Sequence, residues 1–299
     1  MKKRVVALLL GLAAISLAAC GGKKAESQAE TTKAAESGTD KAGEKESAKA
    51  TEQAKADGEA VKIKIGASPS PHAEILEAAK DALKKEGVDI EIVTYNDYVQ
   101  PNLAVNDKEL DANFFQHLPY LNNFMEEHPE VHLVNAGAIH IEPMGIYSKK
   151  LKDLTSVSDG ATVAIPNDPT NGGRSLLLLE KAGLLKLKDG VNEKATVNDI
   201  ADNPKHLKFQ EVEAAQVPRT LDDVTLAVIN TNYAMQANLV PTKDALFMED
   251  KTSPYVNIIA VRQGDENRPE IQALVKALQS DTIRQFMEEH YKGAIVPAF

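Results

Sequence analysis

The stretch "VKIKIGASPSPHAEILEAAKDALKKEGVDIEIVTY", residues 61–95, decides the fold class of this chain. In "VKIKI", β-branched residues alternate with lysines, which predicts a strand with one buried face. The next segment has apolar residues at helical spacing, Ser70 as a candidate N-cap and Gly87 as the stop signal. "VDIEIVTY" predicts a second strand. A strand, helix, strand unit of this kind builds parallel sheets through right-handed crossovers.

The same alternation of strand and helix patterns continues to the end of the chain. Further strands are predicted at "VHLVNA", "IEPMGIYS", "TVAIP", "LKFQEVE", "TLAVIN" and "YVNIIAVR". Helices are predicted at "GGRSLLLLEKAG", "TNYAMQAN", "PEIQALVKALQS" and "TIRQFMEEHY". The pattern therefore predicts an α/β protein with two domains, each with a largely parallel sheet covered by helices.

The N-terminus has the pattern of an export signal. Lys2, Lys3 and Arg4 precede "VVALLLGLAAISLAA", a run too short for a comfortable membrane span and typical of a signal-peptide core. "LAAC" ends on Cys20, the only cysteine in the chain, and resembles the bacterial lipoprotein signal. We therefore expect residues 1–19 to be a lipoprotein signal peptide and Cys20 to carry the lipid, with palmitate among its acyl chains. The alternative is a small buried cysteine at the end of a transmembrane helix.

Residues 20–60 follow with no aromatic and no large aliphatic residue. Their composition of Ala, Glu, Lys, Ser, Thr and Gly cannot bury enough apolar surface to fold. We expect this segment to be the lipidated cysteine and a disordered tether, with the folded body beginning at Val61.

Composition and motifs argue against several classes of function. The formal net charge of -10 disfavours a nucleic-acid partner, because affinity for phosphate backbones comes mostly from clustered Lys and Arg. Neither "GxSxG" nor "GxxxxGK[ST]" occurs, and the acidic residues show no recognisable pairing motif. We therefore expect a protein that is not an enzyme and that carries no cofactor.

Seven motifs in the body carry a specific resemblance to a known family. In order they are "PHAEIL", "YNDYVQPN", "DANFFQHLPYL", "IEPMGIYS", "PNDPTNGGRSLLLLEKAGL", "LAVINTNYA" and "EDKTSPYVNIIAVR". Together with the N-terminal signal, they resemble the methionine-binding lipoproteins of bacterial ABC importers, the NlpA lipoprotein family. The resemblance implies a substrate-binding lipoprotein on the extracytoplasmic face of the cell membrane. Its partners would be methionine, an ABC permease and the ATPase of that permease.

The same resemblance implies a two-lobed periplasmic-binding-protein fold, type II-like, with a central ligand cleft. The two crossing strands would fall at "IEPMGIYS" and "YVNIIAVR". Lobe I would then comprise residues 61–144 and 258–299, and lobe II residues 145–257. Ligand binding would close the lobes by a hinge motion.

Arg174 is the candidate partner for a ligand carboxylate. Asn171 is a candidate helix cap in "TNGGRSLLLLE", and the two glycines leave backbone N–H groups uncovered. A helix start beside a guanidinium favours an anion through the dipole, the free N–H groups and bidentate hydrogen bonding. The resemblance also points to Arg174, and Asn171 is included with it among the candidate ligand-binding residues. The alternative is a surface arginine in the first turn of a helix.

Aromatic residues gather in "FFQHLPYL", residues 114–121, although the chain is only 5% aromatic. From the residues alone, this cluster could be core or pocket wall. The resemblance implies that Phe115, His117 and Tyr120, together with Tyr98, form the slot around a methionine side chain. Phe114 is expected in the core.

Asn230 and Asn257 are the candidate partners for the charged ends of a zwitterion. An asparagine offers both a donor and an acceptor without burying a net charge. Their positions in "LAVINTNYA" and "SPYVN" match the family motifs. The alternative for each is a turn or cap residue.

Other ligands are open alternatives: D-methionine, a sulfoxide, a methionine-containing dipeptide or a metal ion. L-methionine ranks first only by resemblance. Histidines 117, 128, 132 and 140 raise the metal alternative, and His128 and His132 are four residues apart. However, Pro129 disfavours a helix across them, so two nitrogens would not share one face. No metal site is expected.

Overall fold

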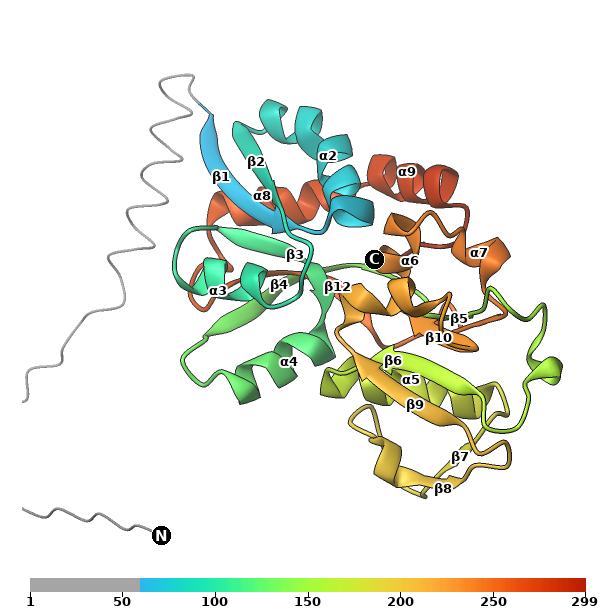
Figure 1. Cartoon of the computed structure of the whole chain (residues 1–299). Helices are drawn as coiled ribbons and strands as arrows, with labels where there is room; N and C mark the ends of the chain where they lie inside the picture. Colours follow the sequence, from blue (N-terminus) through green and yellow to red (C-terminus); the bar gives the residue numbers. More distant parts are fainter. Residues whose placement is uncertain (1–59) are drawn as a thin grey trace, which may run out of the picture. The chain divides into compact units, whose positions relative to one another are not determined.

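Two mixed β-sheets organise residues 60–299, the part of the chain that this computed structural model describes (Figure 1). The predicted signal peptide, Cys20 and nearly all of the predicted tether lie outside the described residues. Within residues 60–299, no helix is long and apolar enough to cross a bilayer.

The first sheet has six strands in the order β13-β4-β12-β3-β1-β2. Their bounds are Val61–Ala67 for β1, Val88–Thr94 for β2, Ala112–His117 for β3, Leu133–Ile141 for β4, Val256–Arg262 for β12 and Val296–Pro297 for β13. Strand β1 runs parallel to β2 and β3, whereas β12 runs antiparallel to β3 and β4. The prediction of a largely parallel sheet is therefore wrong. The reason is that β12 enters from the second sheet, so no local strand, helix, strand crossover sets its direction.

The second sheet has five strands in the order β11-β5-β10-β6-β9. Their bounds are Gly145–Tyr147 for β5, Thr162–Pro166 for β6, Lys208–Val212 for β9, Leu226–Ile229 for β10 and Phe247–Met248 for β11. Strand β6 is parallel to β9 and β10, and β5 is antiparallel to β10 and β11. This sheet is mixed as well. Strands β7 (Lys186–Leu187) and β8 (Ile200–Asp202) form a separate two-stranded ribbon.

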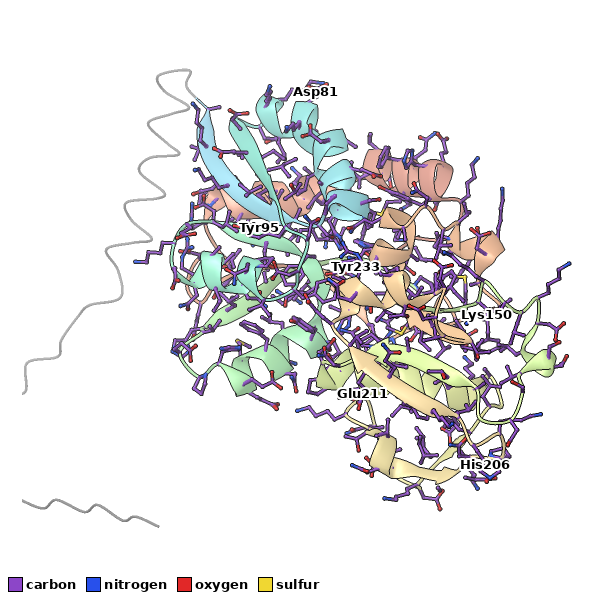
Figure 2. All side chains as sticks on the ribbon, in the orientation of Figure 1. Asp81, Tyr95, Lys150, His206, Glu211 and Tyr233 are labelled. Carbon is purple, nitrogen blue, oxygen red and sulfur yellow. The ribbon has the colours of Figure 1, made fainter. Side chains whose placement is uncertain are left out.

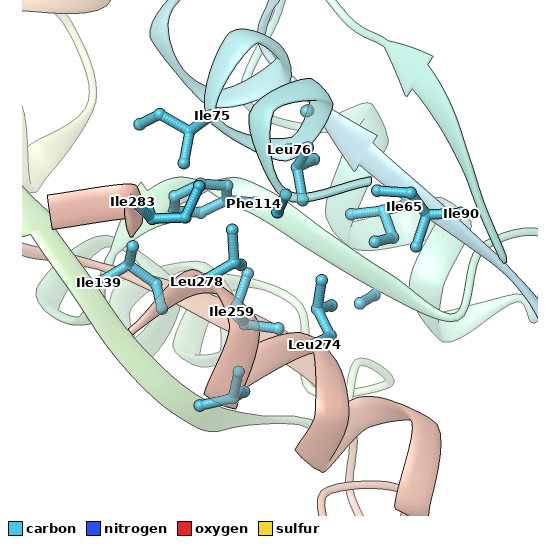
Figure 3. Close-up of a cluster of buried hydrophobic side chains, with 14 of the residues drawn as sticks. Ile65, Ile75, Leu76, Ile90, Phe114, Ile139, Ile259, Leu274, Leu278 and Ile283 are labelled. Atoms are coloured by element: carbon cyan, nitrogen blue, oxygen red, sulfur yellow. The ribbon is translucent and has the colours of Figure 1, made fainter. Parts of the chain in front are cut away.

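Helices cover both faces of each sheet. On the first sheet, α2 (Glu74–Lys85), α8 (Pro269–Leu278) and α9 (Asp281–Tyr291) pack over one core cluster, and α3 (Gln100–Asn106) and α4 (Leu118–Glu127) pack over another. On the second sheet, α5 (Pro169–Lys181) covers one face, and η4 (Ala214–Thr220) with α6 (Thr231–Gln236) covers the other. Figure 3 shows the first of these clusters, with Phe114 at its centre. Short turns complete the order: η1 (Pro69–Ala73), η2 (Leu154–Ser156), η3 (Val197–Asp199) and α7 (Pro241–Asp244).

The first predicted helix begins later than its sequence pattern indicates. Ser70 has an extended backbone (φ -137°, ψ 139°) inside the π-helical turn η1, and the regular helix α2 starts only at Glu74. Ser70 is therefore not the cap of a continuous helix from residue 71. The predicted stop is confirmed, because Gly87 follows the helix with a φ of 77°.

The chain passes between the two sheets twice. Residues 142–144 connect β4 to β5, and residues 249–255 connect β11 to β12. The predicted strand "IEPMGIYS" is consequently split, since Ile141 ends β4 in the first sheet and Gly145 begins β5 in the second. These two connections bring polar residues to the space between the sheets.

Candidate ligand-binding site

A small cavity lies between the two sheets, at the ends of β3 and β10 and the starts of α5 and α6. Small-molecule sites commonly lie at such interfaces between domains, with a few placed polar groups in their lining. All eight residues predicted to bind ligand line it: Tyr98, Phe115, His117, Tyr120, Asn171, Arg174, Asn230 and Asn257. Four further residues line the cavity and were not predicted from the sequence: Gln116, Glu142, Thr231 and Asn232.

Arg174 is buried, so the alternative of a surface arginine is wrong. Only 3% of Arg174 is exposed. Its Nε and Nη2 donate to the two carboxylate oxygens of Glu249 at 2.8 and 2.5 Å. Nη2 also donates to the carbonyl oxygen of Glu142 at 2.8 Å, and the guanidinium carbon lies 4.2 Å from the centre of the Tyr255 ring. The guanidinium is therefore held in place by groups of the protein itself.

These contacts keep Arg174 charged and leave one nitrogen for a ligand. Burial by itself lowers the pKa of Arg174, but the Glu249 carboxylate raises it above its ordinary value. No hydrogen bond within residues 60–299 uses Nη1, although Arg174 lines the cavity. Nη1 is thus the donor available to an anion.

The start of α5 differs from the prediction in its capping residue. Asp168, and not Asn171, is the N-cap, since its Oδ1 accepts from the backbone N–H of Asn171 at 2.9 Å. Gly173 is needed for packing, because a Cβ there would overlap the backbone carbonyl of Glu193. Gly173 therefore lets α5 approach the loop at Glu193 closely, with Arg174 next to it at the cavity.

A chain of amide hydrogen bonds fixes the polarity of one cavity wall. The Asp168 carboxylate can only accept, so Asn171 presents Nδ2 to its two oxygens at 2.9 and 3.1 Å. The Oδ1 of Asn171 is then left to accept from Nδ2 of Asn230 at 2.8 Å and from Nε2 of His117 at 3.2 Å. His117 is therefore the neutral tautomer with its proton on Nε2. Its Nδ1 accepts from the backbone N–H of Tyr120, in agreement with this assignment.

Two buried polar atoms at the cavity have no partner within residues 60–299. They are Oδ1 of Asn230 and Nδ2 of Asn232. The Oδ1 of Asn232 accepts from the Tyr98 hydroxyl at 2.7 Å, which leaves the Nδ2 donor of Asn232 without a partner. Leaving a buried polar group unpaired costs about 1–3 kcal/mol, so an acceptor and a donor left together indicate a place for a polar ligand.

Aromatic residues form a second, less polar part of the cavity lining. The Tyr98 ring centre lies 5.6 Å from those of both Phe115 and Tyr120, and Tyr98 stacks on Tyr233 of α6 at 4.9 Å. Phe114 lies on the other face of β3, in the core, as predicted. Successive side chains of a strand point to opposite faces, which separates the two phenylalanines.

Asn257 lies beside a buried histidine, and the other histidines differ in their burial. Asn257 Oδ1 lies 3.1 Å from Nε2 of His72. His140 is fully buried, whereas His132 is exposed and His128 half-buried. Within residues 60–299, one group could hold a metal ion: His72, His140 and Glu142. It includes only one of the four histidines noted in the sequence.

The buried histidines predict a loss of stability in mild acid. Burial lowers the pKa of His72 to about 4 and those of His117 and His140 to about 3, from an ordinary value of 6.5. Below pH 6.5 the unfolded chain therefore binds more protons at these sites than the folded chain, so the free energy of unfolding falls with falling pH. Each histidine should contribute a loss of about 1.5 kcal/mol between pH 6.5 and 5. The raised pKa values of Asp168 and Glu142, caused by burial, oppose this loss in part.

Urea denaturation at pH 7, 6 and 5 measures this dependence. We expect the midpoint to shift to lower urea as the pH falls. Equal or greater stability at pH 5 would contradict the assignment of neutral, buried histidines.

Two α/β lobes joined by two short connections, with a polar cavity between them, define a substrate-binding protein of the periplasmic type. The chain belongs to the NlpA lipoprotein family, whose sequence profile matches residues 63–299. This is a family of binding proteins and not of enzymes.

Comparisons with known proteins agree on sequence and fold. The D-methionine-binding lipoprotein MetQ of Escherichia coli K12 is 47% identical over 237 residues, which are 78% of this chain and 87% of that protein. A nutrient binding protein from Burkholderia cenocepacia, solved bound to methionine, is 48% identical with a TM-score of 0.77, covering 79% of this chain and 100% of the other. A lipoprotein structure from Ruminococcus gnavus is 51% identical with a TM-score of 0.79, covering 80% and 100%.

Proposed function

We propose that this chain captures methionine in the cavity between its lobes and delivers it to the permease and ATPase of an ABC importer. The observation that carries the proposal is the set of groups that converge on one small cavity. They are a fixed guanidinium, an unpaired acceptor, an unpaired donor and an aromatic wall. Support comes from two relatives, one named as a D-methionine-binding lipoprotein and one solved with methionine bound.

In this proposal each part of methionine meets a matching group. The carboxylate accepts hydrogen bonds from Nη1 of Arg174 and Nδ2 of Asn232, because both are donors without a partner within residues 60–299. The ammonium donates to the free Oδ1 of Asn230. The thioether chain lies on the aromatic wall, where a sulfur contact contributes roughly 0.3 to 1.5 kcal/mol. The ligand-binding residues are then Tyr98, Phe115, His117, Tyr120, Asn171, Arg174, Asn230 and Asn257, with Asn232 added.

The lobe boundaries follow from the same proposal. With the two connections between the sheets as the hinge, lobe I comprises residues 61–144 and 256–299, and lobe II residues 145–255. Lobe II was predicted to extend to residue 257, but Val256 and Asn257 pair in the first sheet as part of β12. Arg174 of lobe II reaches the connection residues Glu142 and Glu249. Ligand contact with Arg174 would therefore stabilise the closed arrangement of the hinge.

Isothermal titration of the purified chain with L-methionine, D-methionine, methionine sulfoxide and a methionine-containing dipeptide tests the function. We expect L-methionine to bind most tightly. If another of these ligands binds most tightly, the assignment of the cavity as the binding site stands and the assigned ligand changes. No binding of any of them to protein stripped of bound ligand would refute the proposal.

The membrane anchor is the second part of the proposal. Residues 1–19 are the signal peptide, Cys20 carries the lipid, and residues 20–60 tether the body to the extracytoplasmic face of the membrane. Replacing Cys20 by serine removes the thiol that receives the lipid, so we expect the variant to leave the membrane fraction while methionine affinity stays unchanged. Sedimentation of Cys20→Ser with membranes, like the wild type, would contradict the anchor.

A further inference from the structure

Glu142 is a buried carboxylate at the cavity that the proposed ligand contacts do not use. It lies in the connection 142–144, is 6% exposed and lines the cavity. Its Oε1 lies 3.1 Å from Nε2 of His72 and 2.9 Å from Nε2 of His140. Its Oε2 accepts from the backbone N–H of Asn232 at 3.0 Å. Three donors from three different segments thus converge on one side chain.

An ionised carboxylate makes these contacts with both imidazole nitrogens as donors. A protonated acid would have to donate its O–H to one of the two nitrogens and would require the other tautomer of that ring. The histidines are neutral, and Nδ1 of His72 lies 2.6 Å from the Ser68 hydroxyl. Burial raises the pKa of Glu142, while His72, Arg174 and the Asn232 N–H lower it in part. A nearby cation on the ligand would lower it further.

The charges around the cavity do not balance without such a cation. Glu142, Glu249 and Asp168 are three carboxylates against the single guanidinium of Arg174, which Glu249 already pairs in bidentate fashion. A buried excess negative charge is costly unless a partner compensates it. A ligand with only a carboxylate would add a further negative charge, whereas a zwitterion also brings a positive one.

We propose that Glu142 is the counter-charge that makes this cavity select ligands with a free α-ammonium group. The inference rests on the proposed function and deepens it by naming the substrate class: α-amino acids are accepted, and α-hydroxy or desamino acids of the same shape are rejected. His72 and His140 are positioning residues, because each holds the carboxylate through Nε2 and neither lines the cavity.

A metal ion is the competing occupant of His72, His140 and Glu142, whose ligand atoms lie within 4.8 Å of one another. A metal bound at Nε2 of His140 would force the ring proton onto Nδ1. That atom is buried and has no partner within residues 60–299, whereas histidine ligands almost always donate their second N–H. With the proton on Nε2, only a lone pair is left unpaired there. The geometry therefore favours a carboxylate held by two neutral imidazoles.

The test compares two ligands on two proteins. Methionine and 2-hydroxy-4-(methylthio)butanoate, in which a hydroxyl replaces the ammonium, are titrated into the wild-type chain and Glu142→Gln. We expect the wild type to prefer methionine at least about 100-fold, and Glu142→Gln to reduce that ratio at least about tenfold, mainly by weakening methionine binding. Glu211→Gln, an exposed change on β9, is the matched control and should keep the wild-type ratio (Figure 2).

Each outcome separates this inference from the proposed function. If the wild type binds neither ligand, both the proposed function and this inference are refuted. If the wild type binds the two ligands equally, or if Glu142→Gln keeps the wild-type ratio of affinities, only this inference is refuted. If the wild type binds zinc stoichiometrically and Glu142→Gln abolishes that binding, His72, His140 and Glu142 form a metal site and the inference is refuted. Should Glu142→Gln fail to fold, carbon-13 NMR of the wild-type Glu142 carboxyl decides. Its signal should be that of an ionised carboxylate and should shift with methionine but not with the hydroxy acid, and a protonated carboxyl that persists with methionine bound refutes the inference.

Discussion

Replacing Arg174 by alanine is expected to weaken methionine binding by about 2–5 kcal/mol, the scale for truncating one partner of a buried charge pair. The side chain supplies the only guanidinium among the cavity-lining residues and holds it rigidly against Glu249 and Tyr255. The variant should also lose stability, by about 3 kcal/mol, because the carboxylate of Glu249 stays largely buried without its cation. The sequence alone indicated no such partner for Arg174.

Titration calorimetry at constant pH and salt measures the affinity, and urea denaturation measures the stability. Arg174→Lys keeps the charge but loses the bidentate fork, so its affinity should fall between those of the wild type and Arg174→Ala. Arg219→Ala, an exposed arginine of η4, is the control and should change neither quantity. Wild-type affinity in Arg174→Ala would refute the assignment of the carboxylate partner.

Replacing Phe114 by alanine is expected to lower the free energy of unfolding by about 3–5 kcal/mol without removing the binding site. Phe114 has no exposed surface and lies among side chains from α2, α8 and the sheet (Figure 3). Its ring also meets the edge of His72 at 4.6 Å between ring centres. Alanine would leave a cavity that such a packed cluster fills only in part.

The neighbouring residue provides the contrast. Phe115→Ala opens the aromatic wall of the ligand cavity, so it should weaken methionine binding in the folded protein. The folded fraction of Phe114→Ala should bind methionine with nearly wild-type affinity when binding is measured well below the melting temperature of the variant. Similar affinity losses in both variants would contradict the separation of core and pocket along β3.

The fold and the site could be predicted from the sequence to different extents. The strand, helix, strand unit at residues 61–95 was predictable because its hydrophobic periods are regular. Strand β3 was not predicted, since all six of its residues are buried and no alternation marks it. The mixed direction of the sheets was equally out of reach, because it depends on β12 returning from the second lobe.

The cavity residues were found from motifs, but the groups that orient them were not. Arg174 is held by Glu249, which is 75 residues away in the chain, and Glu142 is held by His72 and His140. No local pattern links such partners. Asn232 is different, because it stands two residues after Asn230 at the start of the same helix and could have been proposed from that position.

Native mass spectrometry of the purified chain, both as isolated and after unfolding and refolding to remove any bound ligand, tests methionine binding most directly. We predict a released mass that matches methionine or a close derivative, and rebinding of methionine by the refolded protein in a one-to-one complex. A chain that releases no small molecule and, once refolded, binds no amino acid would contradict this prediction.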